Sequence, residues 1–484
     1  MSKALPPPGH VRMVQSKGSR GLRLASAVAA PLNFPASQIF TNCYYFPSEF
    51  SLVATVKIQT LRQKTNEYIF SVVREGSDSL LLGLRVSENH RPPCSRPEQG
   101  QLWFNAQGKG LFICDGLTVS PVCAGKQRLD YVEDYQDLYT RSETLDVEVF
   151  SIPSEGLFMA AANKDSRSGS GIYRWTNASF QLYQNISTQE ARSWKHFTID
   201  NKIFLVVAAN FREAGSERSV IYQWHRRRRR FVRYQTLETH TAQDWEAFRI
   251  HNHSFLVVAN HRRDSNHNIH SVIYRWNPDT KLFEVNQTLL TSGAYDWEFF
   301  TVGPYHFLVV ANTFDGRTTI ISSTIYVWLD GSFQTFQSIQ TVGATDWEPF
   351  QIDGRFFLAV ANSQKIPDRG TSVYSINSTV YELNALTQTF IRFQDILTHS
   401  ALDWEFFTIG DEKFLVVANS HDGGSYSLNS VVYRWQGYEG FVPVHSLPTF
   451  GCRDWEDFST DEGSFLIYSS AKSRLSKVFK LRNY

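Results

Sequence analysis

A short acidic and aromatic motif that returns about every 50 residues constrains this chain more than any other feature. The motif is Asp-Trp-Glu followed two positions later by phenylalanine, as in Asp244-Trp245-Glu246-Ala247-Phe248. Five copies are complete, and two weaker copies lie upstream of them. The central residues of all the copies are Val147, Trp194, Trp245, Trp297, Trp347, Trp404 and Trp455. Self-similarity at such a period predicts a repeat architecture.

Each repeat contains four segments with the character of β-strands. The first begins with the motif itself, as in residues 297–302. The second is a continuous apolar run that ends in asparagine, such as residues 255–260, and it recurs at 307–312, 357–362 and 414–419. A run that is apolar on both sides is buried on both faces of a sheet, so these strands should lie between neighbouring sheets. The closing asparagine suits a turn with unusual backbone angles.

The third and fourth segments complete the repeat. The third is exemplified by residues 271–276, Ser-Val-Ile-Tyr-Arg-Trp. In the fourth, Phe333, Gln337, Ile339 and Thr341 are separated by even numbers of residues and therefore share one face of a strand. An outermost strand with one packed and one wet face has this pattern. Four strands in each of seven units predict an all-β fold, a seven-bladed β-propeller.

The two ends of the repeat region predict how the ring closes. The last unit has its first three strands, and the chain stops soon after them. The spacing of the fourth strand appears instead before the first unit, at Val132, Gln136, Leu138 and Thr140. We therefore expect this N-terminal strand to dock into the C-terminal blade, where it covers an otherwise unpaired sheet edge. The propeller is placed at residues 127–484.

The region before the propeller divides into three segments by composition. Residues 1–38 are rich in proline, glycine, serine and basic residues and are expected to be mostly loop. In residues 39–90, apolar runs at 50–58, 68–73 and 80–86 predict strands. Residues 91–126 are expected to be a linker with one small hairpin.

The three inner strand motifs together, Asp-Trp-Glu, Phe-Leu-Val-Val-Ala-Asn and Ser-Val-Ile-Tyr-Arg-Trp, resemble the epilepsy-associated (EAR, or EPTP) repeat family. The stretch from Asn42 to Leu84 resembles the beginning of a thrombospondin-type laminin G domain. This combination is similar to secreted relatives of the leucine-rich glioma-inactivated proteins. The laminin-G-like part stops near Asn89, short of the roughly 100 residues of a full sandwich. The start of the chain also lacks the apolar core of a secretory signal, so we expect an alternative or shortened N-terminal region.

The resemblance implies a secreted, non-enzymatic protein whose propeller binds receptor ectodomains at epithelial cell surfaces. It also implies a link to sensory and ectodermal epithelia, to hearing and to Notch signalling. The competing interpretation is a cytosolic scaffold, because many propellers serve that purpose. A glycan-processing enzyme is less favoured: its paired carboxylates would be a few unmatched residues, whereas here the acidic motif recurs in nearly every unit.

The charge balance and hydropathy exclude other classes. There are 48 basic and 47 acidic side chains, which argues against a dedicated nucleic-acid or anionic-membrane surface. No run of about 18 apolar residues predicts a transmembrane helix.

The aspartates of the motif are the candidate metal ligands, because the first strand of a blade usually lines the central channel. These residues are Asp146, Asp244, Asp296, Asp346, Asp403 and Asp454, with Ser193 in the remaining place. Converging carboxylates repel one another unless a cation or hydrogen-bond donors compensate them, so a calcium or sodium ion held by oxygen ligands is one hypothesis. The favoured alternative is structural: each aspartate caps backbone amides and each tryptophan wedges between blades. No cofactor is required.

Three further features predict surface chemistry. Three functions are open for the basic run Arg226, Arg227, Arg228, Arg229 and Arg230: it could bind heparan sulfate, be cut by a protease or, in a cytosolic protein, act as a nuclear signal. The structural alternative is a solvated turn. Glycosylation sequons occur at Asn177, Asn185, Asn252, Asn286 and Asn377. Cys94 and Cys114, two of five cysteines, are candidates for a disulfide in an oxidising compartment, and free thiols are the alternative.

Overall fold

The computed structural model describes residues 11–16, 19–24, 67–73, 80–87, 101–105, 110–114, 119–121, 128–213 and 216–483. The chain divides into two compact units, Met1–Ala124 and Gly125–Tyr484. In the parts of the chain that the structure describes, no helix is long and apolar enough to cross a membrane.

The described part of the second unit forms seven four-stranded antiparallel sheets, which are the blades of a propeller. The first strands are β9 (Thr144–Ile152), β13 (Ser193–Ile199), β17 (Ala242–Ile250), β21 (Ala294–Val302), β25 (Ala344–Ile352), β29 (Ala401–Ile409) and β33 (Cys452–Thr460). The second strands are β10 (Gly156–Asn163), β14 (Lys202–Glu213), β18 (His253–Asn260), β22 (Tyr305–Asn312), β26 (Arg355–Asn362), β30 (Glu412–Asn419) and β34 (Gly463–Ser470).

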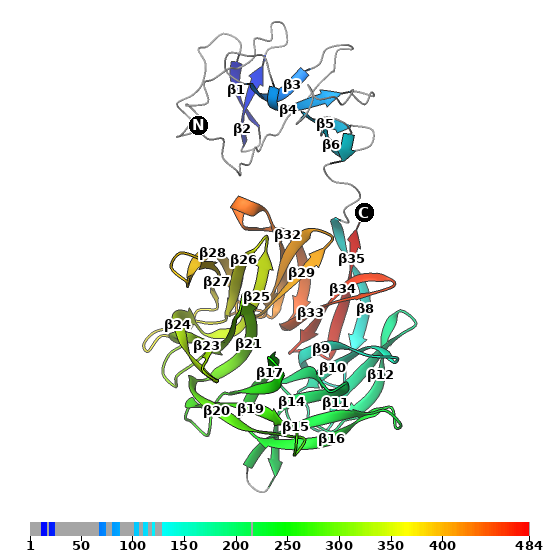
Figure 1. The fold of residues 1–484 in the computed structure, drawn as a ribbon, viewed down its shortest axis with the longest axis vertical. Coiled ribbons are helices and arrows are strands. Elements are labelled where there is room, and N and C mark those ends of the chain that lie inside the picture. The colour runs from blue at the N-terminus through cyan, green and yellow to red at the C-terminus, as the bar shows by residue number, and fades with distance from the viewer. Residues whose placement is uncertain are drawn as a thin grey trace. The chain divides into compact units, whose positions relative to one another are not determined.

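The third strands are β11 (Ser170–Thr176), β15 (Ser216–His225), β19 (Asn268–Asn277), β23 (Ile320–Leu329), β27 (Ser375–Asn384), β31 (Ser427–Trp435) and β35 (Leu475–Asn483). The outer strands of blades 1 to 6 are β12 (Ser179–Ile186), β16 (Arg230–Glu238), β20 (Leu282–Ser292), β24 (Ser332–Val342), β28 (Thr389–His399) and β32 (Phe441–Phe450). The outer strand of blade 7 is β8 (Leu129–Tyr139), which comes from the N-terminal side of blade 1. Figure 1 shows the first strands around a common centre and the outer strands at the periphery.

Closure of the ring by the N-terminal strand is confirmed. Strand β8 pairs with β35 along nearly its whole length, from Leu129 opposite Asn483 to Tyr139 opposite Leu475. Blade 7 is thus built from both ends of the repeat region. The pairing satisfies the backbone of β35, which would otherwise be an exposed sheet edge.

The core lies between the blades, as the apolar second strands predict. In β22 the last six residues, from Phe307 to Asn312, are all buried. One cluster joins Phe255 and Ile273 of blade 3 to Trp297 and Leu308 of blade 4, and the other clusters likewise combine neighbouring blades. Each blade therefore hides both of its faces against its neighbours, and none is a complete core by itself.

The connections from one blade to the next are tight turns in the left-handed backbone region. Gly343 has a φ of +59°, and a Cβ at this position would lie 2.6 Å from the carbonyl oxygen of Gln364. Gly293 has the same conformation, with a φ of +55°. Glycine suits these turns because it reaches positive φ without steric cost.

The asparagines that end five of the seven second strands have a role that differs from the expected one. None of Asn163, Asn260, Asn312, Asn362 and Asn419 is among the described residues with positive φ. Their side chains instead bind neighbouring backbone: in blade 4 the Oδ1 of Asn312 accepts a hydrogen bond of 3.0 Å from Ser292 N, at the end of blade 3. The expectation of unusual backbone angles was wrong, because an amide side chain was needed here to tie one blade to the preceding one.

The first unit contains two sheets among its described residues. Strands β1 (Val11–Ser16) and β2 (Ser19–Leu24) pair within the segment expected to be mostly loop. Strands β3 (Glu67–Val73), β4 (Leu80–Ser87), β5 (Gln101–Asn105), β6 (Gly110–Cys114) and β7 (Val119–Pro121) form one sheet in that order. The hairpin expected in a linker thus belongs to the same sheet as the laminin-G-like strands. The strand expected at 50–58 lies outside the described residues.

Candidate functional site

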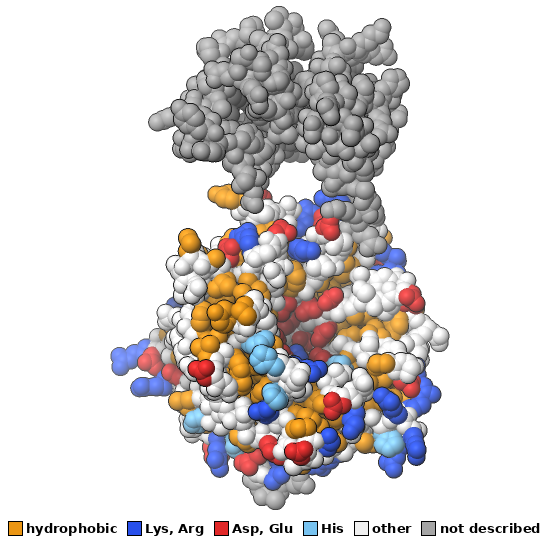
Figure 2. Space-filling view, viewed as in Figure 1, with side chains coloured by type: hydrophobic (Ala, Val, Ile, Leu, Met, Phe, Trp, Pro, Cys, Tyr) orange, Lys and Arg blue, Asp and Glu red, His pale blue; other side chains and the backbone are white. Residues whose placement is uncertain are grey.

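Two stacked rings of side chains from the first strands line the central channel. The upper ring contains the six aspartates of the repeated motif and Ser193 of blade 2. The lower ring, two residues further along each strand, contains Glu148, Lys195, Glu246, Glu298, Glu348, Glu405 and Glu456. Figure 2 shows acidic side chains gathered inside the central hollow of the propeller. The glutamates were not among the site residues expected from the sequence, although they belong to the same repeated motif.

Each aspartate of the upper ring holds the first strand of the next blade. The Oδ2 of Asp346 accepts a hydrogen bond of 2.8 Å from Trp404 N, and that of Asp403 accepts one of 2.8 Å from Trp455 N. The same contact is made by Asp454 to Val147 N, Asp146 to Trp194 N, Asp244 to Trp297 N and Asp296 to Trp347 N. This arrangement is the structural role that we favoured from the sequence.

The tryptophans of the motif are the wedges between the blades. Trp347 is fully buried, and its indole nitrogen donates a hydrogen bond of 3.1 Å to Val310 O in the preceding blade. Trp404 makes the equivalent bond to Val360 O. A buried aromatic ring with a satisfied N–H fixes the angle between two blades, and its removal would cost about 3–5 kcal/mol.

Blade 2 departs from the pattern and supplies the cation of the lower ring. Lys195 Nζ lies 2.8 Å from Glu246 Oε2 of blade 3, and both side chains are largely buried. Although burial opposes the charge, the neighbouring carboxylates of Glu246, Glu298 and Glu148 raise the pKa of Lys195 well above its usual value. Lys195 thus balances part of the negative charge around it.

The buried environment of the remaining channel carboxyls disfavours their charged form. Burial raises the pKa of Glu348 to about 8, although Phe406 N donates a hydrogen bond of 2.9 Å to its Oε1. Burial likewise raises the pKa of Glu148 to about 7, although the positive charge of Lys195 favours its charged form and so lowers this pKa. For Asp346, burial and then Asp403 raise the pKa well above its usual value. Burial therefore brings the pKa of at least these two glutamates of the lower ring close to neutral pH.

One end of the channel is crossed by an arginine. The guanidinium of Arg453, on blade 7, lies 5.1 Å from the ring centre of Tyr295, on blade 4. Its Nε donates a hydrogen bond of 3.2 Å to Leu145 O on blade 1. Arg192 of blade 2 is close enough that Arg453, after burial, contributes to lowering its pKa. Positive side chains therefore stand over the aspartate ring at this end.

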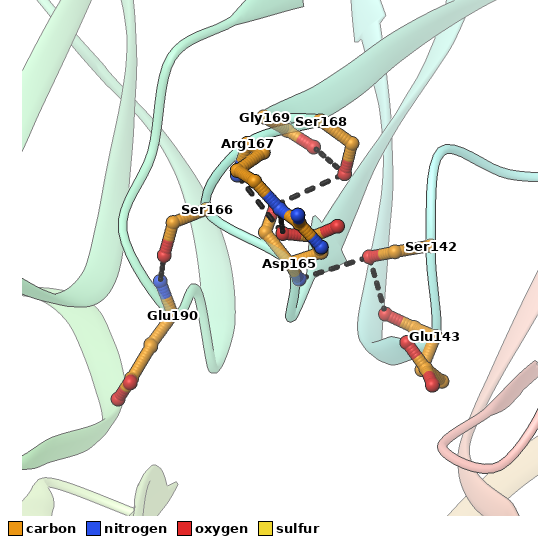
Figure 3. A network of polar contacts seen from close by, with 8 residues as sticks. All are labelled: Ser142, Glu143, Asp165, Ser166, Arg167, Ser168, Gly169 and Glu190. Carbon is orange, nitrogen blue, oxygen red and sulfur yellow. Dashed lines mark hydrogen bonds and ion pairs between the residues drawn. The ribbon is translucent and has the colours of Figure 1, made fainter.

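The loops that surround this end are braced against one another. Figure 3 shows the loop between β10 and β11, where Asp165 N donates to Ser142 Oγ at 3.0 Å on one side. On the other side Glu190 N donates to Ser166 Oγ at 3.3 Å. The loop of blade 1 is thereby tied to the connection from blade 7 on one side and to the connection to blade 2 on the other.

The described residues contain no group of three or more His, Cys, Asp or Glu side chains that could hold a metal ion. One carboxylate oxygen of each channel aspartate is already engaged by a backbone amide. The calcium ion suggested by the converging aspartates therefore stays a prediction from the sequence.

The outer rim carries a second set of contacts between blades, which the sequence pattern did not reveal as such. The side chain of Gln337, on blade 4, donates to Phe390 O at 2.9 Å and accepts from Phe390 N at 2.8 Å, on blade 5. Equivalent pairs are Gln136 with Phe180, Gln184 with Phe231, Gln235 with Phe283, Gln287 with Phe333 and Gln394 with Phe441. The spacing of Phe and Gln was the signal, but their partners lie on different blades.

The other predicted site residues are placed as follows. The five sequon asparagines are all exposed, as are the five arginines from Arg226 to Arg230. Cys114 is disulfide-bonded, whereas Cys94 lies outside the described residues, so their pairing stays a prediction. Cys452 is a buried free thiol.

The closed ring, its motif-bearing first strands and its N-terminal outer strand define a seven-bladed propeller of the EPTP class. The EPTP domain model matches residues 179–225, 230–277, 282–329, 332–384, 389–436 and 440–481. All six matches run from the outer strand of one blade to the third strand of the next. The sequence repeat is thus offset from the blade by one strand, which is what allows the ring to close.

Two relatives match along almost the whole chain. The mouse thrombospondin-type laminin G domain and EAR repeat-containing protein is 45% identical, over 98% of this chain and 92% of its own. The human protein of the same name is 46% identical, over 98% and 93%. The mouse leucine-rich repeat LGI family member 3 is 27% identical over 38% of this chain and 31% of its own. The chain belongs to the family of thrombospondin-type laminin G domain and EAR repeat-containing proteins.

Proposed function

We propose that this protein is a non-enzymatic recognition module that acts outside the cell, as a ligand or adhesion protein at epithelial surfaces. The partner would be a receptor ectodomain. In the same proposal, the protein serves sensory and ectodermal tissue, including hearing, and Notch signalling. One observation carries the non-enzymatic part: every channel aspartate holds a backbone amide of the next blade. Side chains committed to assembling the ring are unsuited to turning over a substrate.

The end of the ring around Arg453 and Tyr295 is the better candidate for the receptor-binding face. Here the second and third strands are joined by long loops, such as residues 363–374 between β26 and β27. At the opposite end, most turns are short, such as residues 353–354 between β25 and β26. Long loops on a rigid scaffold are where recognition residues usually lie. The bracing in Figure 3 supports the same choice, because fixed loops lose little entropy on binding.

Action outside the cell is supported by the exposure of the five sequon asparagines. Secreted protein should therefore shrink on a denaturing gel after treatment with an N-glycosidase, and substitution of Asn286 by glutamine should remove one step of that shift. A chain that is made in the secretory pathway without any shift would contradict this part of the proposal.

The central experiment measures binding of the labelled full chain to epithelial cells over a range of concentrations. Saturable binding that unlabelled protein displaces is expected. Substitution of Arg317, Lys365 and Arg369 by serine, all exposed on loops of blades 4 and 5, should weaken it. The same substitutions should leave the melting temperature unchanged. Binding that does not saturate would refute the recognition function. A second measurement in the presence of a calcium chelator tests whether a calcium ion contributes to binding.

A further inference from the structure

The strongest unexplained surface feature is the turn between β15 and β16 in blade 2. Its residues run from Arg226 to Arg229, and Arg230 begins the next strand. All five arginine side chains are exposed. Five consecutive cations on one tight turn repel one another, so a structural role alone does not account for them.

The backbone of this turn is fixed from both sides. The hydroxyl of Tyr183 on blade 1 donates a hydrogen bond of 2.5 Å to Arg229 O, and the guanidinium of Arg229 contacts Glu155 Oε2 at 2.5 Å. Arg226 Nη2 donates to Asn201 O at 3.2 Å, and His225 pairs with Arg230 across the hairpin. A protease needs an extended segment, and a closed, anchored hairpin does not offer one. The structure therefore disfavours cleavage at this turn.

The anchoring leaves three arginines for another purpose. Arg226 and Arg229 use their guanidinium groups within the fold. Within the described residues, no side-chain hydrogen bond or ion pair is found for Arg227, Arg228 or Arg230. A rigid turn that presents three exposed guanidinium groups is preorganised for an anionic ligand, because the entropy of ordering the loop is already lost.

The neighbouring blade extends the positive surface. In antiparallel blades, the turn between the first and second strands shares an end with the turn between the third and fourth. Blade 3 therefore places Arg249 and Arg275 at the same end as the arginine turn, and blade 2 adds Lys202, all three exposed. At this end of blades 6 and 7 the turns instead carry exposed Asp411, Glu439, Asp461 and Glu462. Among the described residues, the exposed basic side chains of the turns at this end therefore lie on blades 2 and 3, which form one arc of the ring, whereas the partly exposed Arg355, Lys413 and Arg434 stand at the same end of blades 5 and 6.

We propose that this arc, Lys202, Arg227, Arg228, Arg230, Arg249 and Arg275, binds a sulfated glycosaminoglycan chain such as heparan sulfate. A linear polyanion suits a row of cations spread over two blades better than a compact ligand does. Arginine binds oxyanions through paired N–H donors, and release of counterions from the polymer adds to the affinity. The balanced net charge and the exposed sequons favour an extracellular glycan over a nucleic acid.

The test uses the purified full chain and immobilised heparin, with the dissociation constant measured at several salt concentrations. The protein is first treated with an N-glycosidase, because the sequon at Asn252 lies in the same turn region as Arg249. The variant Arg227→Ser, Arg228→Ser, Arg230→Ser keeps both anchoring arginines. It should bind at least about tenfold more weakly at physiological salt, and the slope of log affinity against log salt should fall by about two to three.

The matched control is Arg317→Ser, Lys365→Ser, Arg369→Ser, which removes the same formal charge from loops at the opposite end of the ring. It should bind heparin like the unchanged protein. A control that loses as much affinity as the turn variant would overturn the site, as would a turn variant with unchanged affinity and slope. Equal binding to chemically desulfated heparin or to poly-glutamate would overturn the assignment to a sulfated glycan. These outcomes do not depend on the receptor-binding experiment, in which the other end of the ring is tested.

Discussion

The blades are joined twice, once beside the channel and once at the outer rim, by side chains of different electrical character. Beside the channel, Asp346 offers one oxygen of an ionisable carboxyl group to Trp404 N. At the rim, Gln337 satisfies both the N–H and the carbonyl of Phe390 and adds no charge. The rim contact can be repeated around the ring without penalty. The channel contact cannot, because each further aspartate raises the repulsion among the others.

Each set of contacts is interrupted once around the ring. The two interruptions lie at different joints, where a joint is the interface between two neighbouring blades. The channel set lacks an aspartate where Ser193 of blade 2 faces blade 3, and Lys195 supplies a positive charge two residues away. The rim set lacks a glutamine between blades 6 and 7, where His445 takes that position. There Glu412 Oε2 accepts a hydrogen bond of 3.0 Å from Leu129 N at the start of the closing strand. No joint between the described blades lacks both contacts.

Removal of the closing strand should have the largest effect, because it eliminates rim contacts on both sides of blade 7. Deletion of residues 127–141 would expose the edge of β35 and leave Phe180 without Gln136. We expect loss of the cooperative melting transition and association into oligomers, as exposed sheet edges pair with one another. Size-exclusion chromatography with light scattering and thermal unfolding are the measurements.

Deletion of Met1–Ala124 is the matched control, because it removes a separate compact unit and leaves β8 in place. This control should stay monomeric with its melting temperature nearly unchanged. A strand-deleted protein that also remained monomeric, with the melting transition of the intact chain, would mean that β8 is dispensable for closure.

Much of the ring could be predicted because each blade repeats the same physical problem. Periodic motifs such as Asp346-Trp347-Glu348 identify the first strands, and the displaced spacing at Val132 and Gln136 identifies the strand that closes the ring. The hydrogen bonds of the aspartates could also be predicted from the sequence, because buried carboxylates in a repeated position need hydrogen-bond donors. These inferences depend only on features within one repeat.

Contacts that join residues of different repeats escaped prediction. The spacing of Phe333 and Gln337 marks one face of a strand but does not say that Gln337 reaches Phe390 on the next blade. The contact of Arg453 with Tyr295 crosses the channel, so it depends on the diameter of the closed ring. The asparagines were misjudged for a related reason: a backbone preference was inferred where a side-chain bond to the preceding blade decides the residue.

A pair of alanine substitutions at neighbouring joints compares the two sets of contacts, because Gln337 joins blade 4 to blade 5 and Asp346 joins blade 5 to blade 6. Gln337→Ala leaves both backbone groups of Phe390 without partners in a partly buried place, which should cost about 2–3 kcal/mol. Asp346→Ala also removes a hydrogen bond, but it relieves repulsion within the ring, so its net cost should be about 1 kcal/mol or less. Equilibrium urea unfolding gives both values.

The control for this pair is Gln334→Ala, an exposed glutamine on the same strand, which should change the stability by less than about 0.5 kcal/mol. If Asp346→Ala proved as costly as Gln337→Ala, repulsion within the channel would be negligible, and the distinction between the two sets of contacts would fail.

The smallest expected effect is a dependence of stability on pH between about 6.5 and 8, which arises from the channel alone. Burial raises the pKa of Glu348 to about 8 and that of Glu148 to about 7. In this range the folded protein binds more protons at these groups than the unfolded chain, so stability falls as pH rises. Burial lowers the pKa of His196 and His261 to about 4, which has the opposite effect only below about 6.5.

The melting temperature should therefore decrease from pH 6.5 to pH 8.5 at constant ionic strength, and Glu348→Gln should flatten this decrease. Glutamine keeps an acceptor for Phe406 N while it removes the charge that faces Asp457 and the neighbouring Glu405. At pH 8.5 the variant should melt higher than the unchanged protein, whereas Gln337→Glu at the rim should melt lower at every pH. A melting temperature that stayed constant across this range, or rose with pH, would show that the channel carboxyls are compensated in solution. The channel and the rim would then hold the blades by equivalent means.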